Sequence, residues 1–146
     1  MRPARHAYAW GVANAHDAAH RLVAAAGTGE LDAVCARRRV RLLGLFGSAT
    51  RPAPDREPDD LDVAVSFAEH PDELGLLDDL VRITGYDHID LAVVDGAGPV
   101  LRAEAMIGVA LFESEPGLYA STQMAALAQR RDTQWLRDLD LEALQR

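Results

Sequence analysis

The chain has 146 residues, of which 49% are hydrophobic and 26% are charged, and its formal net charge is -8 at pH 7. This length suits one domain with a hydrophobic core, and the composition argues against disorder. The acidic charge argues against a protein that binds the phosphate backbone of nucleic acids, so we expect no direct nucleic-acid partner. One cysteine, Cys35, permits no internal disulfide, and no apolar run approaches the roughly 20 residues of a membrane span. We therefore expect a cytoplasmic protein that does not bind a membrane.

The first part of the chain predicts helices. The alanine-rich stretch 12–26 predicts a helix that ends at Gly27, and residues 30–38 predict a second, shorter one. His16 and His20 lie four residues apart, so they would share a helix face and could share a metal ion. No third ligand is spaced to join them, so we interpret them as surface histidines.

The middle of the chain predicts a sheet. Residues 40–46 are a nearly continuous apolar run that ends at a glycine, which is typical of a strand covered on both faces. Further strands are expected at residues 61–67, 88–94 and 109–113, and further helices at residues 71–84, 99–107, 118–131 and 133–145. This order predicts a small α/β (α+β) domain, divided into an N-terminal helical segment (1–38), a catalytic core (39–115) and C-terminal helices (116–146).

Two groups of apolar side chains in these helices are expected to face the core. In the helix at 71–84 they lie on one side at helical spacing: Leu74, Leu77, Leu80 and Val81. In the two C-terminal helices we expect core packing, rather than a docking surface, from Met124, Leu127, Trp135, Leu136, Leu139 and Leu144.

The tripeptide Asp-Leu-Asp occurs twice, and only its first copy suits a shared ligand. The copy from Asp138 to Asp140 lies in a predicted helix, where residues two apart point about 200° apart. The copy from Asp60 to Asp62 begins a strand, where residues two apart share a face with about 6.5 Å of rise between them. Two such carboxylates can converge on one cation, or on two cations about 3.5–4 Å apart.

A third aspartate is expected beside this pair. Asp90 lies between Ile89 and Leu91 in a predicted strand, where a carboxylate is costly unless it is paired, hydrogen-bonded or bound to a metal. If the two strands are neighbours, about 4.8 Å apart, Asp90 joins Asp60 and Asp62 in a three-carboxylate cluster. Such oxygen ligands select Mg²⁺ or Mn²⁺. The alternative is that all three are surface aspartates, with Asp90 facing solvent on an open sheet.

Gly47 and Ser48 follow the first predicted strand and supply groups that bind phosphate. A glycine at such a turn lets backbone N–H groups approach a phosphate, and the serine hydroxyl adds a donor. A Gly-Ser pair alone is typical of many turns, but its pairing with Asp-x-Asp at the head of the next strand is specific. Phosphate held between metal-bound carboxylates and such a turn indicates phosphoryl or nucleotidyl transfer.

This set of residues resembles the motif of the DNA polymerase β-like nucleotidyltransferase superfamily. Within it, the small size and the stretch 107–119 (IGVALFESEPGLY) are similar to the minimal nucleotidyltransferases (MNT), antitoxins typically paired with HEPN ribonuclease toxins. The resemblance covers residues 40–132. It implies a small mixed β-sheet flanked by helices, two Mg²⁺ ions and ATP as donor. It further implies transfer of AMP to a tyrosine of a HEPN toxin, with which the chain would form a hetero-oligomer.

The resemblance also implies roles for single residues. It assigns the metal ions to Asp60, Asp62 and Asp90, and the triphosphate to Gly47, Ser48 and Arg51. Asp90 would also help to deprotonate the attacking hydroxyl. Independently of the resemblance, His88 lies two residues before Asp90 on the same predicted strand face, which makes it a candidate for an outer partner of the site or a neighbour of the nucleotide.

The loop between the two strands departs from the family pattern. The glycine that usually follows the family arginine is replaced by Pro52, and the loop carries additional acids at Asp55, Glu57 and Asp59. Asp59 is an alternative ligand to Asp60. We prefer Asp60 because it shares a strand face with Asp62, whereas Asp59 does not.

Two other functions stay open at this point. A non-catalytic antitoxin would neutralise its toxin by binding alone, and an acidic surface suits contact with a basic ribonuclease. The other possible function is that of a small-molecule (antibiotic) nucleotidyltransferase. The chain is short for this function, because such relatives usually carry an additional substrate domain.

Overall fold

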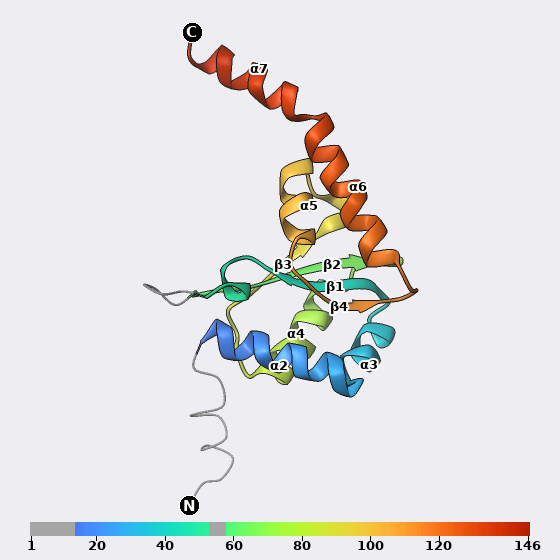
Figure 1. Ribbon diagram of the computed structural model, residues 1–146. Coiled ribbons are helices and arrows are strands. Elements are labelled where there is room, and N and C mark those ends of the chain that lie inside the picture. Colours follow the sequence, from blue (N-terminus) through green and yellow to red (C-terminus); the bar gives the residue numbers. More distant parts are fainter. Residues whose placement is uncertain (1–13, 53–57) are drawn as a thin grey trace, which may run out of the picture.

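The computed structural model describes residues 14–52 and 58–146 (Figure 1). The strands are β1 (Val40–Phe46), β2 (Leu61–Phe67), β3 (Ile89–Val93) and β4 (Val109–Glu113). The helices are α2 (Ala15–Thr28), α3 (Glu30–Arg37), α4 (Glu73–Thr84), α5 (Pro99–Met106), α6 (Leu118–Asp132) and α7 (Gln134–Leu144), with 3₁₀ turns η1 (Ser48–Thr50) and η2 (Val94–Gly96). None of the helices described is both long and apolar enough to cross a membrane.

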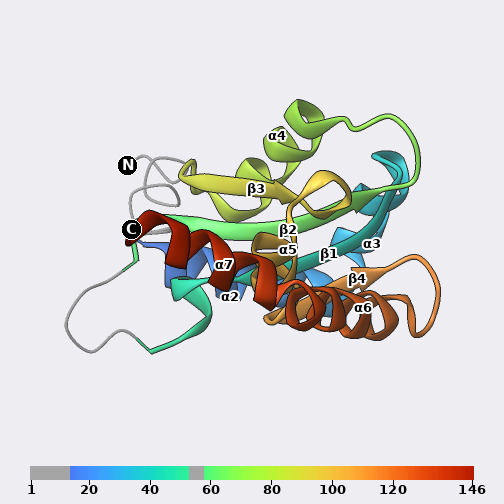
Figure 2. The ribbon, with the colours of Figure 1, turned by 90° about the horizontal axis from the view of Figure 1, so that it is seen from above.

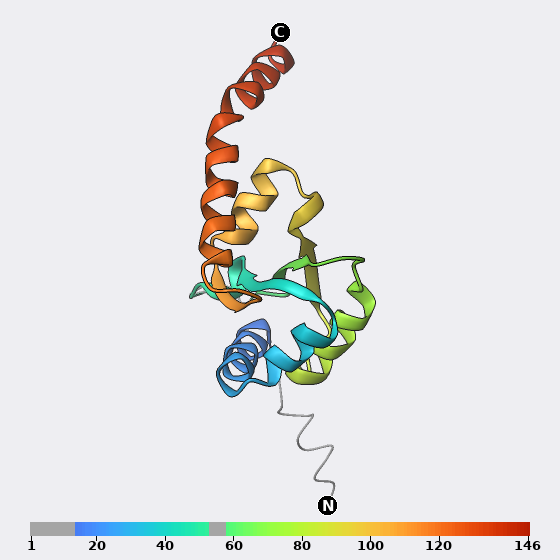
Figure 3. The same cartoon turned by 90° about the vertical axis from the view of Figure 1, so that its right-hand side faces the viewer.

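The four strands form one mixed sheet in the order β3-β2-β1-β4, seen from above in Figure 2. Strand β1 is antiparallel to both β2 and β4, whereas β2 and β3 are parallel. Helices α2, α3 and α4 cover one face of the sheet, and α5 and α6 cover the other (Figure 1, Figure 3). The predicted fold class, a small mixed sheet flanked by helices, is therefore confirmed.

The alternation of side chains along β2 places its apolar and acidic residues on opposite faces of the sheet. Leu61, Val63 and Val65 are fully buried in a core cluster that includes residues of α2 and α4. Ala64 packs in a second cluster, with residues of α5 and α6. Because residues two apart share a face, Asp62 lies on the α5–α6 side.

Tyr119 fixes α6 on the sheet. It lies over Gly44 of β1, where an added Cβ would come closer than 3.0 Å to the tyrosine Oη. The side chain is 7% exposed, and Oη has no hydrogen-bond partner among the described residues. Burial raises the pKa of Tyr119. The close fit explains the glycine in β1, and the unpaired hydroxyl costs stability.

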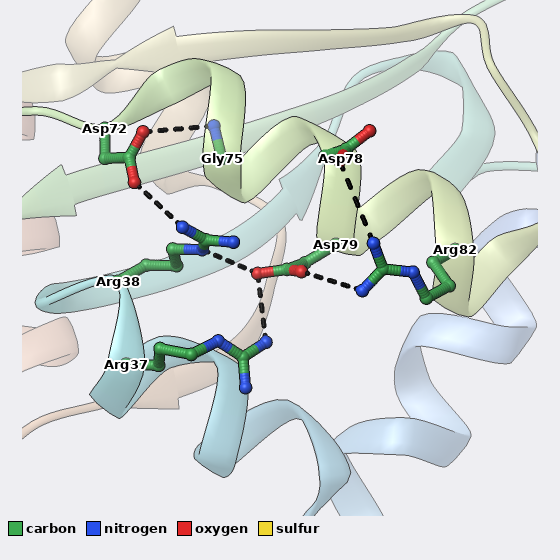
Figure 4. A network of polar contacts seen from close by, with 7 residues as sticks. All are labelled: Arg37, Arg38, Asp72, Gly75, Asp78, Asp79 and Arg82. Carbon is green, nitrogen blue, oxygen red and sulfur yellow. Dashed lines mark hydrogen bonds and ion pairs between the residues drawn. The ribbon is translucent and has the colours of Figure 1, made fainter.

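Helices α3 and α4 are joined by ion pairs around the buried carboxylate of Asp79 (Figure 4). Asp79 is 2% exposed, accepts a hydrogen bond from Arg38 Nε at 2.7 Å and lies 3.1 Å from Arg37 Nη2. Arg38 also donates to Asp72, the N-cap residue of α4, at 3.0 Å. The hydrogen bond from Arg38, and then that from Arg37, hold the pKa of Asp79 below its ordinary value despite burial.

The predicted buried face of α4 is confirmed for Leu80 and wrong for Leu74, and these ion pairs explain the difference. The helix buries Leu76, Asp79 and Leu80, whereas Leu74 is 81% exposed. Because Asp79 pairs with arginines of α3, its side of the helix turns inward. Leu77 and Val81 are then left at the edge of the core, only partly buried.

Three helix boundaries also differ from expectation. Helix α2 begins at Ala15 rather than at residue 12, because Asn14, with an extended backbone, is its N-cap. Helix α2 does not end at Gly27 but runs to Thr28, because Gly29, with φ 85°, adopts the left-handed conformation that ends a helix. Helix α4 begins at Glu73 rather than at residue 71, as predicted. Asp72 is its N-cap and accepts a hydrogen bond from the Gly75 N–H. The other described helices and strands lie within one residue of their predicted bounds.

The prediction that the last two helices pack into the core is wrong for their large apolar residues. All six of those named above are exposed: Met124, Leu127, Trp135, Leu136, Leu139 and Leu144. Helix α7 has no buried residue, and it extends away from the sheet beyond α6 (Figure 3). Helix α7 continues from the end of α6 that lies far from the sheet, beyond the helices that cover it (Figure 1).

Candidate functional site

The parallel pairing of β2 and β3 brings two of the predicted aspartates side by side. Asp62 and Asp90 are register partners on neighbouring strands. Asp60 lies directly before β2, and Asp60 and Asp90 are exposed, whereas Asp62 is half-buried. Burial, then the charge of Asp90, then that of Asp60 raise the pKa of Asp62. Asp90 and Asp60 thus each place a negative charge near Asp62, and the pairing of Asp62 with Asp90 is the strand adjacency on which the predicted cluster depends.

The donor atoms and charges at this site fit a divalent cation. Carboxylate oxygens are the ligands that Mg²⁺ prefers, and a cation would relieve the repulsion that raises the pKa of Asp62. Across residues 14–52 and 58–146, no group of three or more His, Cys, Asp or Glu side chains is already arranged to hold a metal ion.

The turn after β1 touches this acidic site directly. Phe46, the last residue of β1, pairs with Asp62 across the antiparallel ladder. Gly47 follows with φ 77°, and a Cβ there would lie closer than 3.0 Å to Asp62 Oδ2. Only glycine meets both conditions without strain. The turn and the aspartate are therefore packed against each other.

The rest of the turn is a single 3₁₀ turn, η1. Ser48 begins it with an exposed side chain. Thr50 closes it, because both its backbone N–H (3.2 Å) and its Oγ1 (2.7 Å) donate to the carbonyl oxygen of Gly47. The Ser48 hydroxyl is therefore presented to solvent at the start of the turn, next to the acidic site.

A cavity of about 460 Å³ joins the turn to Asp62. Its lining includes Gly47 and Arg51, predicted to hold triphosphate, and Asp62, predicted to hold metal. Ser48, Asp60 and Asp90 lie outside the lining. The remaining lining residues were not predicted from the sequence: Phe46, Thr50, Glu104 and Ile107.

Glu104 and Ile107 reach the cavity from α5 and from the residue that follows it. Their position depends on how α5 packs over the end of β1, and no local sequence signal encodes that packing. Glu104 adds a second carboxylate to that of Asp62, so the lining of the cavity contains one cationic residue, Arg51, and two acids.

The side chain of His88 contacts Tyr86 and Asp87, and its role beside the aspartates or the nucleotide stays a prediction. Its ring lies 5.6 Å from that of Tyr86, and its Nε2 lies 3.5 Å from a carboxylate oxygen of Asp87. His88 precedes β3, and its backbone carbonyl accepts a hydrogen bond from the Leu61 N–H at 2.9 Å. It thus contributes to the strand pairing through its main chain.

The structure bears on the choice between Asp59 and Asp60. The charge of Asp60, but not that of Asp59, contributes to the raised pKa of Asp62. The backbone carbonyl of Asp59 accepts a hydrogen bond from the Tyr86 hydroxyl. The preference for Asp60 over Asp59 as a ligand stays a prediction. The loop acids Asp55 and Glu57 lie outside the described residues.

No protein-family model matches the chain, and no curated protein matches it. Solved structures do. A mutant MntA toxin–antitoxin complex, with two Asp-to-Glu substitutions two positions apart, matches with TM-score 0.63 and 18% identity, over 81% of this chain and 98% of its own. A toxin–antitoxin complex with AMP-PNP gives the same four values. The complex of a tri-AMPylated Shewanella oneidensis HEPN toxin with an MNT antitoxin matches with TM-score 0.59 and 18% identity, over 81% and 95%. The chain therefore has the fold of the MNT antitoxins, as the resemblance of its motif predicted.

Proposed function

We propose that this chain is a Mg²⁺-dependent nucleotidyltransferase that acts as an antitoxin by transferring AMP from ATP to a tyrosine of a HEPN ribonuclease toxin. The observation that carries the proposal is the register pairing of Asp62 with Asp90, with Gly47 packed against Asp62. This contact joins a turn suited to phosphate with carboxylates suited to metal.

The residues take the roles that the motif implies. Asp60, Asp62 and Asp90 would hold two Mg²⁺ ions, which when bound neutralise the carboxylates and the triphosphate oxygens. Gly47 and Ser48 hold the triphosphate through the backbone and hydroxyl of the turn, and Arg51 adds a positive charge in the same cavity.

The reaction is a displacement at the α-phosphorus of ATP. The tyrosine oxygen of the toxin forms a bond to that phosphorus, the bond to pyrophosphate breaks, and the phenolic proton passes to Asp90. Asp90 suits this role because it is exposed at the edge of the cluster, where an acceptor from another protein can reach it. The similar structures with AMP-PNP and with a tri-AMPylated toxin support the choice of ATP and of a HEPN partner.

A second function, neutralisation by binding alone, is favoured by one observation. Helix α7 presents Trp135, Leu136 and Leu139 to solvent, and none of its residues is buried. Exposed aromatic and aliphatic side chains on one helix suit contact with another protein. Binding of this kind is compatible with catalysis, so experiment must separate the two.

The two functions differ in their dependence on the aspartates. The chain is incubated with ATP labelled at the α-phosphate, Mg²⁺ and a candidate HEPN toxin. The enzyme hypothesis expects label on the toxin with wild type, none with Asp62→Ala, and full labelling with the matched control Asp140→Ala from the second Asp-Leu-Asp. Equal labelling with wild type and Asp62→Ala, or none with either, would reject it.

Rescue of growth in cells that express the toxin tests binding alone. If Asp62→Ala still protects the cells as well as wild type, the antitoxin acts without catalysis. Loss of protection, with normal complex formation in a pull-down, supports AMP transfer.

A further inference from the structure

His16 of α2 reaches the turn that follows β1. Its Nε2 lies 2.9 Å from the backbone carbonyl oxygen of Arg51, 35 residues further along the chain. Because a carbonyl oxygen only accepts hydrogen bonds, this nitrogen must carry the proton and donate it. His16 is half-buried, whereas His20, one helical turn away, is exposed. The two histidines of the helix therefore differ in their surroundings.

Helix α2 holds His16 in a defined place. Asn14 caps the helix by accepting a hydrogen bond from the Asp17 N–H at 2.9 Å, which orders the turn that contains His16. Ala15 and Ala18 are fully buried, and they belong to the same core cluster as Ala49 of η1. The helix and the turn are thus parts of one packed unit, and the His16 bond spans two fixed elements.

Arg51 is held at both of its backbone polar groups. Its N–H donates to the carbonyl oxygen of Ser48 at 3.2 Å, and its own carbonyl accepts from His16. The residue is extended, with φ -121° and ψ 150°. It lines the cavity that also contains Gly47 and Asp62. His16 therefore helps to set the point from which the Arg51 side chain leaves the main chain.

We propose that His16 is a positioning residue for nucleotide binding, which acts by holding the Arg51 carbonyl so that Arg51 keeps its place in the lining of the cavity that also contains Asp62. This inference rests on the proposed function, because it takes the ligand of the cavity to be a nucleoside triphosphate. His16 itself does not touch the nucleotide. Its loss therefore weakens binding of the triphosphate more than it slows the chemical step.

Three variants separate this role from a general effect on folding. His16→Leu keeps an apolar side chain but removes the donor, and His16→Gln keeps an N–H at a similar reach. His20→Leu is the matched control on the same helix. Binding of ATP with Mg²⁺ is measured by calorimetry without the toxin, AMP transfer gives KM and kcat, and thermal unfolding gives Tm.

We expect His16→Leu to raise the Kd and the KM for ATP about three- to tenfold, the range that one lost hydrogen bond represents, with kcat changed by less than about twofold. His16→Gln should restore both values, and His20→Leu should leave them unchanged. Wild-type Kd in His16→Leu, or a Kd in His16→Gln as weak as in His16→Leu, overturns the proposal.

These measurements distinguish failure of the positioning role of His16 from failure of the proposed function. If wild type binds ATP in a His16-dependent way but transfers no AMP, the positioning role stands and AMP transfer is rejected. If transfer occurs and the His16 variants behave like wild type, only the positioning role is rejected. Should His16→Leu fail to fold, His16→Asn, whose amide is too short to reach Arg51, replaces it.

Discussion

Gly47 lies against the carboxylate of Asp62, so that a Cβ on residue 47 would come closer than 3.0 Å to Asp62 Oδ2. The contact joins the end of β1 to β2 across an antiparallel pair, with Phe46 opposite Asp62. The proposed triphosphate and metal sites are therefore parts of one rigid corner of the sheet, and a change in one displaces the other.

Gly47→Ala should reduce AMP transfer by about a hundredfold or more, because the displaced Asp62 no longer lies where the reaction needs it. The strained φ and the clash should also cost about 1–3 kcal/mol of stability. Transfer assays and urea unfolding measure the two effects. Gly27→Ala is the control, since a Cβ in this helical position meets nothing within 4 Å. It should stabilise the chain by about 1 kcal/mol with full activity.

Asp62→Asn should stabilise the folded chain at neutral pH while it abolishes transfer. The pKa of Asp62 is raised above its ordinary 3.8 by burial and by Asp90 and Asp60, so the folded state holds the proton more tightly. The wild type therefore loses stability as pH rises from that value through the raised pKa. The variant should therefore have a higher Tm than wild type at pH values above the raised pKa of Asp62, and this difference should vanish below pH 3.8. If Asp62→Asn is less stable than wild type at pH 7 without Mg²⁺, charge repulsion at Asp62 does not destabilise the folded chain, and the prediction is wrong.

Asp79→Asn should lower Tm by roughly 5–10 °C, because three arginines lose a buried anion. The pKa of Asp79 is held below its ordinary 3.8, so its contribution is present above that value and is lost as pH falls through the lower folded pKa. Thermal unfolding from pH 3 to 7 measures this. Asp78→Asn is the matched control, since Asp78 is exposed and has a single ion pair, of 3.8 Å, among the described residues. An equal loss in both variants would argue against the buried network.

Tyr119→Phe should raise the free energy of unfolding by about 1 kcal/mol. The substitution removes a buried Oη that lacks a partner in the described part of the chain and keeps the ring over Gly44. Tyr86→Phe provides the contrast, because the Tyr86 hydroxyl donates to the carbonyl of Asp59 and its removal should destabilise. Chemical denaturation of both variants decides the matter; a loss of stability in Tyr119→Phe would mean that its hydroxyl is satisfied.

The strands could be predicted from the sequence, because the pattern of apolar residues along each strand shows directly which side chains are buried. Strands β1, β2 and β4 have their predicted bounds, because a run of apolar or alternating residues encodes burial locally. That Asp62 and Asp90 lie side by side could be predicted for the same reason. The alternation of side chains fixes the face of the sheet on which each aspartate lies, and only the order of the strands had to be assumed.

Features that depend on distant contacts could not be predicted. The buried side of α4 is set by Asp79, whose arginine partners Arg37 and Arg38 lie about forty residues earlier in the chain. Glu104 reaches the cavity only through the packing of α5. The leucines of α7 have the spacing of a packed helix, but spacing does not tell whether a surface is there to receive them.

The central claim is that Asp60, Asp62 and Asp90 act together to transfer AMP, with Asp90 as the residue that completes the site. The most direct measurement is the intact and tandem mass of the HEPN partner after co-expression with wild type or with Asp90→Asn. We expect the wild-type sample to carry one or more AMP units on a tyrosine and the Asp90→Asn sample to be unmodified. Unmodified toxin beside the wild-type chain, or equal modification beside Asp90→Asn, would contradict the claim.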